Sequence, residues 1–195
     1  MASVGPSGWF PDPARRYRLR YWDGQQWTGW ATDGDQPIFD AGPRTPGALL
    51  TVLGIGATVA MPFAAWWLIG DESVTSRPRD QLDYVWHAPA ISGAVTATMG
   101  AIALVMVVVG LVGFVAAASR RVIDSRWLLV LAAFVIAGGL LGLIGRVVTA
   151  GTIGANIGGA LAILFGVPIV GLLIGYGFLQ AGWLIVHAHK SRVTP

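Results

Sequence analysis

The side chains best suited to chemistry lie between residues 70 and 90, in a polar stretch between two apolar ones. This stretch carries carboxylates and a histidine, the groups that hydrolases and metal sites use: Asp71, Glu72, Asp80, Asp83 and His87. Their spacing matches none of the short patterns in which such residues bind a metal or carry out catalysis. We therefore expect a solvated or partner-binding loop, no enzymatic activity, no catalytic residue, no metal site and no cofactor.

Ionisable side chains avoid the apolar segments of the chain. No Asp, Glu, Lys, Arg or His lies near the middle of any of them. Ionisable groups inside a membrane usually mark proton relays, ion paths or substrate sites. Their absence argues against a pump, a proton-coupled transporter or a charge-selective channel. Gln180, the most polar side chain in these segments, is expected to hydrogen-bond between helices or at the membrane interface.

Four long apolar runs must position everything else. The last one, from Gly158 to Val186, contains no Asp, Glu, Lys or Arg. As a helix it would be about 44 Å long, against a bilayer core of roughly 30 Å. Only 12% of the residues are charged, about half the share found in soluble domains. The sequence predicts an all-α membrane protein with four transmembrane helices over residues 47–69, 91–118, 127–146 and 158–186.

The predicted bundle covers residues 47–190, with residues 70–90 as an extracytoplasmic loop. Pro62 is expected to kink the first helix, and Pro168 leaves open a break in the fourth. Lys and Arg mark the cytoplasmic side of a membrane protein. If the N-terminus is cytoplasmic, ten of the 13 Lys and Arg residues fall on the inner side and only Arg77, Arg79 and Arg146 fall outside. We therefore expect a multi-pass protein of the plasma (inner) membrane with both termini in the cytoplasm.

Residues 1–46 are polar and turn-rich, and they form a separate cytoplasmic unit with a linker. Leu19 to Trp22 is typical of a strand, Asp23-Gly24 of a hairpin turn, and Gln25 to Trp30 of the return strand. The sequence predicts a small β-hairpin module whose loop is Asp23 and Gly24 alone. Trp22 then faces Gln25 and Arg20 faces Trp27. Arg20, Trp22 and Trp27 share one face, where stacking and cation–π contact hold the fold and Trp9 covers it.

Three short patterns in this module carry a family resemblance. They are Gly8-Trp9-Phe10-Pro11-Asp12-Pro13, Arg20-Tyr21-Trp22-Asp23-Gly24 and Trp27-Thr28. This arrangement resembles a short domain of unknown function at the N-termini of actinobacterial membrane proteins, with the pattern G-W-[YF]-x-D-P…R-[YFW]-W-D-G-x-x-W-T. The chain departs from it at Gly29-Trp30-Ala31, where a polar residue and His often follow. The resemblance implies a lineage and a membrane setting, and it implies no reaction.

Pairs of glycines four residues apart recur on the third and fourth helices. Such pairs let helix backbones approach closely, either within a bundle or against another subunit. We expect the interaction residues to come from these pairs and from the N-terminal module: Trp9, Arg20, Trp22, Asp23, Gly24, Trp27, Gly138, Gly142, Gly171 and Gly175. Gly154 and Gly158 form a further pair. Arg146, at the end of the third helix, is expected to reach the outer headgroups, a lipid phosphate, or Asp71 or Glu72.

Three functions fit these features. The first is a non-catalytic accessory or stabilising subunit of a larger plasma-membrane complex, for example a lipid-transport or respiratory assembly. Its expected partners are membrane lipids and other membrane-protein subunits. The alternatives are a small transporter and an outer-face lipid-modifying enzyme acting through residues 70–90. The basic, aromatic stretch from Arg15 to Trp27 fits anionic lipid better than nucleic acid, so no nucleic acid is expected as a partner.

Overall fold

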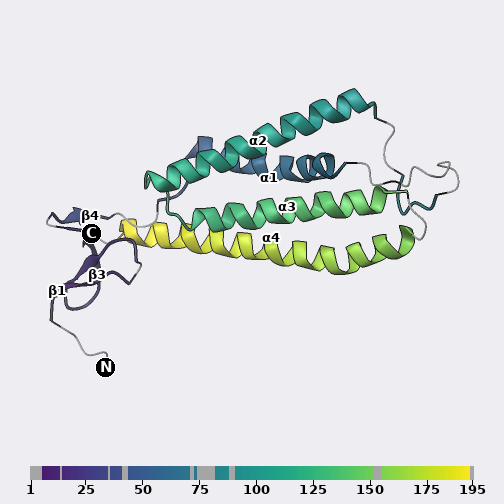
Figure 1. The fold of residues 1–195 in the computed structure, drawn as a ribbon. Coiled ribbons are helices and arrows are strands. Elements are labelled where there is room, and N and C mark those ends of the chain that lie inside the picture. The colour runs from purple at the N-terminus through teal and green to yellow at the C-terminus, as the bar shows by residue number, and fades with distance from the viewer. Residues whose placement is uncertain are drawn as a thin grey trace. The chain divides into compact units, whose positions relative to one another are not determined.

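Four helices follow the four apolar runs of the sequence. They are α1 (Ala48–Ile69), α2 (Gly93–Ser119), α3 (Trp127–Thr149) and α4 (Ala155–Val193) (Figure 1). The computed structural model describes residues 6–13, 15–34, 36–40, 44–70, 73, 82–87, 91–151 and 155–193, with the backbone alone at 155, 156 and 189–193. The chain divides into two compact units, one of residues 1–44 and 183–195 and the other of residues 45–182.

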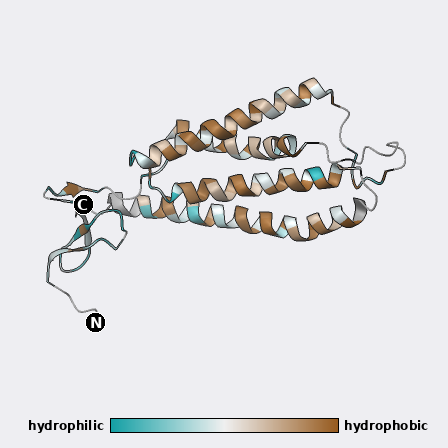
Figure 2. Ribbon diagram, viewed as in Figure 1, coloured by the Kyte–Doolittle hydropathy of each residue, from teal (hydrophilic) through white to brown (hydrophobic). Residues whose placement is uncertain are grey.

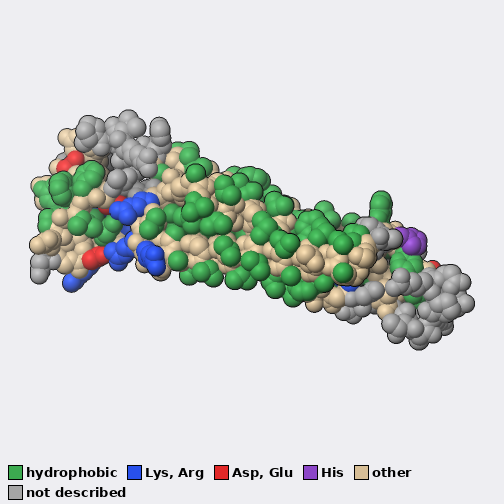
Figure 3. Space-filling view, turned by 90° about the horizontal axis from the view of Figure 1, so that it is seen from above, with side chains coloured by type: hydrophobic (Ala, Val, Ile, Leu, Met, Phe, Trp, Pro, Cys, Tyr) green, Lys and Arg blue, Asp and Glu red, His purple; other side chains and the backbone are tan. Residues whose placement is uncertain are grey.

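All four helices are long and apolar enough to cross a membrane. With 22 residues α1 is the shortest, and at about 1.5 Å per residue it matches a hydrocarbon core of roughly 30 Å. Figure 2 shows the hydrophobic residues distributed along the whole length of the helices, and Figure 3 shows the same side chains exposed on the surface of one face. The prediction of four such helices is confirmed. Both α1 and α4 continue as helices through their prolines, Pro62 and Pro168.

Local sequence explains where the helices end. Gly70 stops α1 because it adopts φ 80°, a conformation that favours glycine. Ser92 caps α2, with its hydroxyl oxygen accepting a hydrogen bond from the Val95 N–H at 3.4 Å. In the turn before α3, a carboxylate oxygen of Asp124 accepts the Arg126 N–H at 2.9 Å. The end of α1 and the starts of α2 and α3 therefore lie at residues whose backbone or side chain suits a helix boundary.

Helix α1 joins α2 and α3, because it packs against both of them while they contact one another much less. Its packing face consists of small residues. Ala57, Ala60 and Ala64 are almost completely buried. On α2, a Cβ at Gly110 would lie 2.6 Å from the Cβ of Ala57. Small residues therefore let the α1 and α2 backbones approach closely, as in other membrane bundles.

Helix α4 lies beside α3 and is the least buried of the four, with 11% of its apolar window inside the structure. The contact runs through aromatic and aliphatic side chains of α3. Phe134 packs edge-on against Phe178, with ring centroids 5.2 Å apart. Phe134 also lies over Gly177, and Ile144 lies over Gly166. One side of α4 therefore faces α3, while Gly159 near its start lies against Val85 and Gly171 and Gly175 in its middle are open.

The N-terminal module is an antiparallel sheet of four strands in the order β1-β2-β3-β4. The strands are β1 (Gly8–Pro11), β2 (Leu19–Trp22), β3 (Trp27–Thr32) and β4 (Ile38–Phe39). The predicted hairpin corresponds to β2 and β3, so an N-terminal β module is confirmed. The sequence analysis did not predict the outer strands β1 and β4, which make the module larger than a single hairpin.

Candidate interaction surfaces

The predicted geometry of the hairpin loop is wrong by two residues. Trp22 pairs with Trp27 across β2 and β3, and not with Gln25, while Arg20 pairs with Ala31, and not with Trp27. The loop therefore contains four residues, from Asp23 to Gln26. Its closure depends on the Asp23 carboxylate, which accepts hydrogen bonds from the backbone N–H groups of Gln25 and Gln26, both at 2.7 Å.

This turn also perturbs the ionisation of Asp23 and the backbone of Gly24. The hydrogen bonds donated by the Gln26 and Gln25 N–H groups favour the charged carboxylate and lower the pKa of Asp23. Gly24 adopts φ 101°, which a residue with a side chain rarely tolerates. Asp23 and Gly24 therefore shape the loop, and nothing in their geometry directs them toward a ligand.

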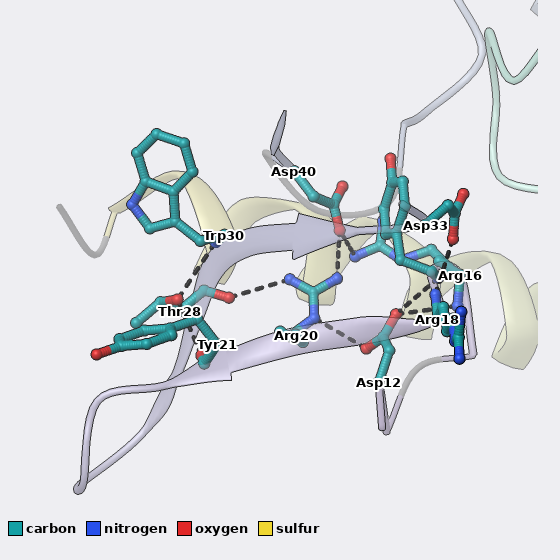
Figure 4. Close-up of polar contacts among 10 residues, drawn as sticks. Asp12, Arg16, Arg18, Arg20, Tyr21, Thr28, Trp30, Asp33 and Asp40 are labelled. Atoms are coloured by element: carbon teal, nitrogen blue, oxygen red, sulfur yellow. Dashed lines mark hydrogen bonds and ion pairs between the residues drawn. The ribbon is translucent and has the colours of Figure 1, made fainter. Parts of the chain in front are cut away.

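Arg20 is the centre of a buried ionic network and does not stack on the tryptophans as predicted. Its Nε donates to the Asp12 carboxylate at 2.8 Å, and a terminal nitrogen donates to the Asp40 carboxylate. The other terminal nitrogen donates to the carbonyl oxygen of Thr28 at 3.1 Å (Figure 4). Arg16 forms a further ion pair with Asp40 at 2.6 Å. The guanidinium therefore connects β2 to β3, and also to Asp12 after β1 and Asp40 after β4, which are the two edge strands.

The electrostatics of Arg20 follow from these contacts. Burial would lower the pKa of its guanidinium, but the hydrogen bonds to Asp12 and Asp40 outweigh burial, and the pKa is raised above its ordinary value. Arg20 is thus a permanent cation whose donors point into the module. Its role is to stabilise the module, which leaves it unavailable to an external partner.

The two acidic partners of Arg20 were not among the residues predicted from sequence. Asp12 lies between Pro11 and Pro13 and also accepts the Arg16 and Tyr17 N–H groups at 3.0 and 3.1 Å. Asp12 belongs to the motif from Gly8 to Pro13 that carries the family resemblance, so the sequence could have singled it out. Asp40 lies directly after β4, within the segment predicted as a linker, and only the fold brings it to Arg20.

Aromatic rings cover both faces of the sheet. Trp22 and Trp27 pack with centroids 5.3 Å apart, and Phe10 contacts Trp27 at 6.3 Å. Trp9 instead contacts Tyr21, at 5.3 Å. Because adjacent strand residues point to opposite faces, Phe10 covers the Trp22–Trp27 face and Trp9 does not, contrary to the prediction.

Several of these rings are also open to solvent. The residues of this exposed aromatic surface are Trp9, Phe10, Trp27, Trp30 and Phe39, which are between 39% and 58% exposed. They lie on both faces of the sheet, and adjacent exposed rings, such as Phe10 with Trp27 and Trp30 with Phe39, usually mark a binding surface. Trp9 and Trp27 therefore combine a packing contact inside the module with a surface that a partner or a membrane could cover.

The four predicted helix glycines separate into two groups. Gly138 and Gly142 face α1 inside the bundle, and a Cβ at Gly142 would lie 2.5 Å from the Pro62 carbonyl oxygen. Gly171 and Gly175 on α4 are exposed, and a Cβ at either would meet nothing within 4 Å. Gly158 is likewise open, while Gly154 lies outside the described residues.

The polar residues between 70 and 90 are described only in part. Asp71, Glu72 and Asp80 lie outside the described residues. Asp83 and His87 are described, and the His87 ring stacks on Tyr84 with centroids 4.6 Å apart. Among the residues that the structure describes, no group of three or more His, Cys, Asp or Glu side chains is placed to hold a metal ion.

These features define the class of protein: four apolar helices indicate a multi-pass membrane protein, and a small β-sheet module precedes them. Residues 7–38 of that module match the model of a family described as a protein of unknown function, DUF2510. The resemblance to a domain of unknown function is therefore confirmed for this segment. No curated protein and no solved structure matches the chain.

Proposed function

We propose that this protein is a non-catalytic accessory subunit that stabilises a larger membrane complex, for example a lipid-transport or respiratory assembly. It binds its partner through the exposed glycine face of α4 and through the N-terminal module. The observation that carries the proposal is the open space above Gly171 and Gly175.

Glycine destabilises the interior of a helix unless a packing contact compensates. It costs about 1 kcal/mol relative to alanine, and at Gly138 and Gly142 close contact with α1 offsets that cost. Gly171, Gly175 and Gly182 have no neighbour within 4 Å among the described residues. At about 100° per residue the three lie within roughly 40° of one another. A helix of another subunit packed on this face would account for them.

The α4 glycines that face α3 lie elsewhere on the helix, while Phe178, which packs against Phe134, lies roughly 20° from Gly171 at one edge of the exposed face. Gly166 and Gly177, which contact Ile144 and Phe134, are roughly 120–140° from Gly171 around the helix axis. Leu172 and Leu179, which are 74% and 77% exposed, border the exposed glycines on the opposite edge, roughly 80–100° from Gly171. The face therefore combines a shallow groove with large apolar side chains at its edges, which suits helix-on-helix packing.

The module offers a second surface. Its exposed aromatic surface, with Arg15 and Arg18 nearby in sequence, suits either a protein partner or the anionic cytoplasmic leaflet. The distribution of Lys and Arg supports a cytoplasmic position for both termini. A plasma-membrane location in an actinobacterium, suggested by the motif, completes the proposal.

The test begins with the tagged full-length protein, purified from its native membranes in a mild detergent, and with mass spectrometry of whatever co-purifies. The proposal predicts a stoichiometric membrane-protein partner. The double variant Gly171→Leu/Gly175→Leu should lose most of that partner, because leucine side chains fill the groove. Gly158→Leu is the matched control, since Gly158 is equally open but lies roughly 140° from Gly171 around the helix. It should retain the partner.

Deletion of residues 8–30 measures the contribution of the module to the same association. A protein that purifies alone and is monomeric in native-like lipid would refute the accessory role. Equal partner recovery from the double variant and the wild type would refute the assignment of the interface to α4.

A further inference from the structure

A cleft of about 350 Å³ lies between α1, α2 and α3, at the helix ends next to residues 70–90. Its volume is in the range of small-molecule sites, about 300–1,000 Å³. Its walls are mostly apolar and include Phe63, Trp66, Met99 and Leu141. Such walls suit a hydrocarbon chain better than a water-soluble ligand.

Glycine keeps this cleft open. Gly145 lines it, and a Cβ there would meet only the edge of the Trp66 ring, at 3.8 Å. Across the cleft, the Trp67 ring lies directly over Gly100 of α2. A side chain at position 145 would therefore extend into the empty space without displacing a helix.

Arg146 lies beside the cleft, because it follows Gly145 in α3 and stacks on Trp66, and both of these residues line the cleft. Its guanidinium carbon is 4.4 Å from the centroid of the Trp66 ring, and the Trp66 indole N–H approaches the Thr149 hydroxyl at 3.5 Å. The Arg146 Nε is buried and has no hydrogen-bond partner among the described residues. A buried donor on a charged group without an acceptor is costly, so this position favours an anion.

We propose that the cleft binds one anionic phospholipid, with an acyl chain against Phe63, Met99 and Leu141 and the phosphate accepting hydrogen bonds from Arg146. The planar guanidinium matches phosphate oxygens in pairs, and its stacking on Trp66 fixes its orientation. Arg146 and Trp66 lie within the last turn of α3 and α1, the level at which Arg and Trp meet headgroups. Free phosphate would leave the apolar volume empty. This inference goes beyond the accessory role and does not depend on it.

The experiment uses the full-length protein in phosphatidylcholine vesicles that contain a trace of a lipid with a photoactivatable acyl chain. Two probes with the same chain are compared, one with a phosphatidylglycerol and one with a phosphatidylcholine headgroup. After illumination, mass spectrometry locates the labelled peptides. We expect the phosphatidylglycerol probe to label the cleft segments 62–67 and 96–100 more strongly than the phosphatidylcholine probe.

Two variants separate the headgroup from the chain. Arg146→Gln should reduce phosphatidylglycerol labelling of the cleft about tenfold, the loss expected for a hydrogen bond to a charged group. Gly145→Leu should abolish labelling of the cleft by both probes, because it fills the space for the chain. Arg120→Gln, which removes an exposed arginine at the C-terminus of α2, is the control and should leave labelling unchanged.

Equal labelling of the cleft by the two probes in the wild type would overturn the proposal. Unchanged labelling in Arg146→Gln would also overturn it, because the guanidinium would then play no part in selecting the lipid. Should Arg146→Gln fail to fold, Gly145→Leu still decides, since persistent cleft labelling in that variant excludes a chain-binding role.

Discussion

Replacing Arg20 with methionine should unfold the N-terminal module while leaving the four helices intact. The Asp12 and Asp40 side chains, which pair with Arg20, are 0% and 4% exposed. Removal of this cation leaves the buried Asp12 carboxylate without a cationic partner and leaves Asp40 with Arg16 alone. Breaking a buried ion pair from one side costs about 3–5 kcal/mol. A domain this small has about that much stability in total, so the substitution should abolish the folded module.

Hydrogen–deuterium exchange on the full-length protein, read by mass spectrometry, measures this effect directly. The amide groups of β2 and β3 should lose protection by a factor of a hundred or more, because each ~1.4 kcal/mol corresponds to a factor of ten. Arg18→Met is the matched control. Arg18 is exposed, and its backbone N–H donates to Asp33 at 2.7 Å whatever the side chain. Its effect should stay within about 0.5 kcal/mol.

Protection of β2 and β3 that stays within tenfold of the wild type in Arg20→Met would refute this reasoning. It would mean that the aromatic contacts alone stabilise the sheet. Arg20→Lys refines the outcome, since lysine retains the charge but cannot bond Asp12, Asp40 and the Thr28 carbonyl together. Its loss of protection should lie between those of the methionine variant and the wild type.

Two further predictions concern glycine packing and the turn. Gly142→Ala should destabilise the bundle by about 1–3 kcal/mol, because its Cβ would lie 2.5 Å from the Pro62 carbonyl oxygen. Gly171→Ala should be neutral or stabilising by up to about 1 kcal/mol. Equal melting temperatures of the two variants in detergent would contradict this. The pKa of Asp23 is lowered from 3.8, so the turn has its full stability above that pH and loses it as the pH falls through the lower folded value. Asp23→Asn, which keeps the acceptor oxygen, should remove this pH dependence of Gln26 amide exchange, and an unchanged profile in the variant would contradict it.

The helices could be predicted from sequence because a bilayer imposes one strong requirement on the chain. Every lipid-facing backbone group must be bonded within its own segment, so a long uncharged run is sufficient to identify a helix. The same requirement explains why Pro168 did not break α4. Which glycines face a neighbour could not be predicted, since Gly138 and Gly171 have the same spacing pattern, and only the arrangement of α1 beside α3 separates them.

The module was predictable in outline and not in register. An Asp-Gly pair favours a two-residue turn, but here the Asp23 side chain bonds two backbone N–H groups and stabilises a longer loop. Whether the Asp23 side chain or the backbone closes the turn depends on the local geometry. The spacing of residues in the sequence does not specify that geometry. The Arg20–Asp40 contact joins residues twenty apart through an intervening strand pair, so a pairwise pattern in the sequence could not reveal it.

The central position of α1 has a consequence for how the protein is made. Of the four helices, α1 comes before its two partners, α2 and α3, which are therefore synthesised after it. Until they arrive, its alanine-lined side faces lipid or the insertion machinery. Because α2 and α3 contact one another so little, neither can dock before α1 is in place. We therefore expect α2 and α3 to assemble around α1, the earliest of the four helices, and α4 to pack against α3 after them.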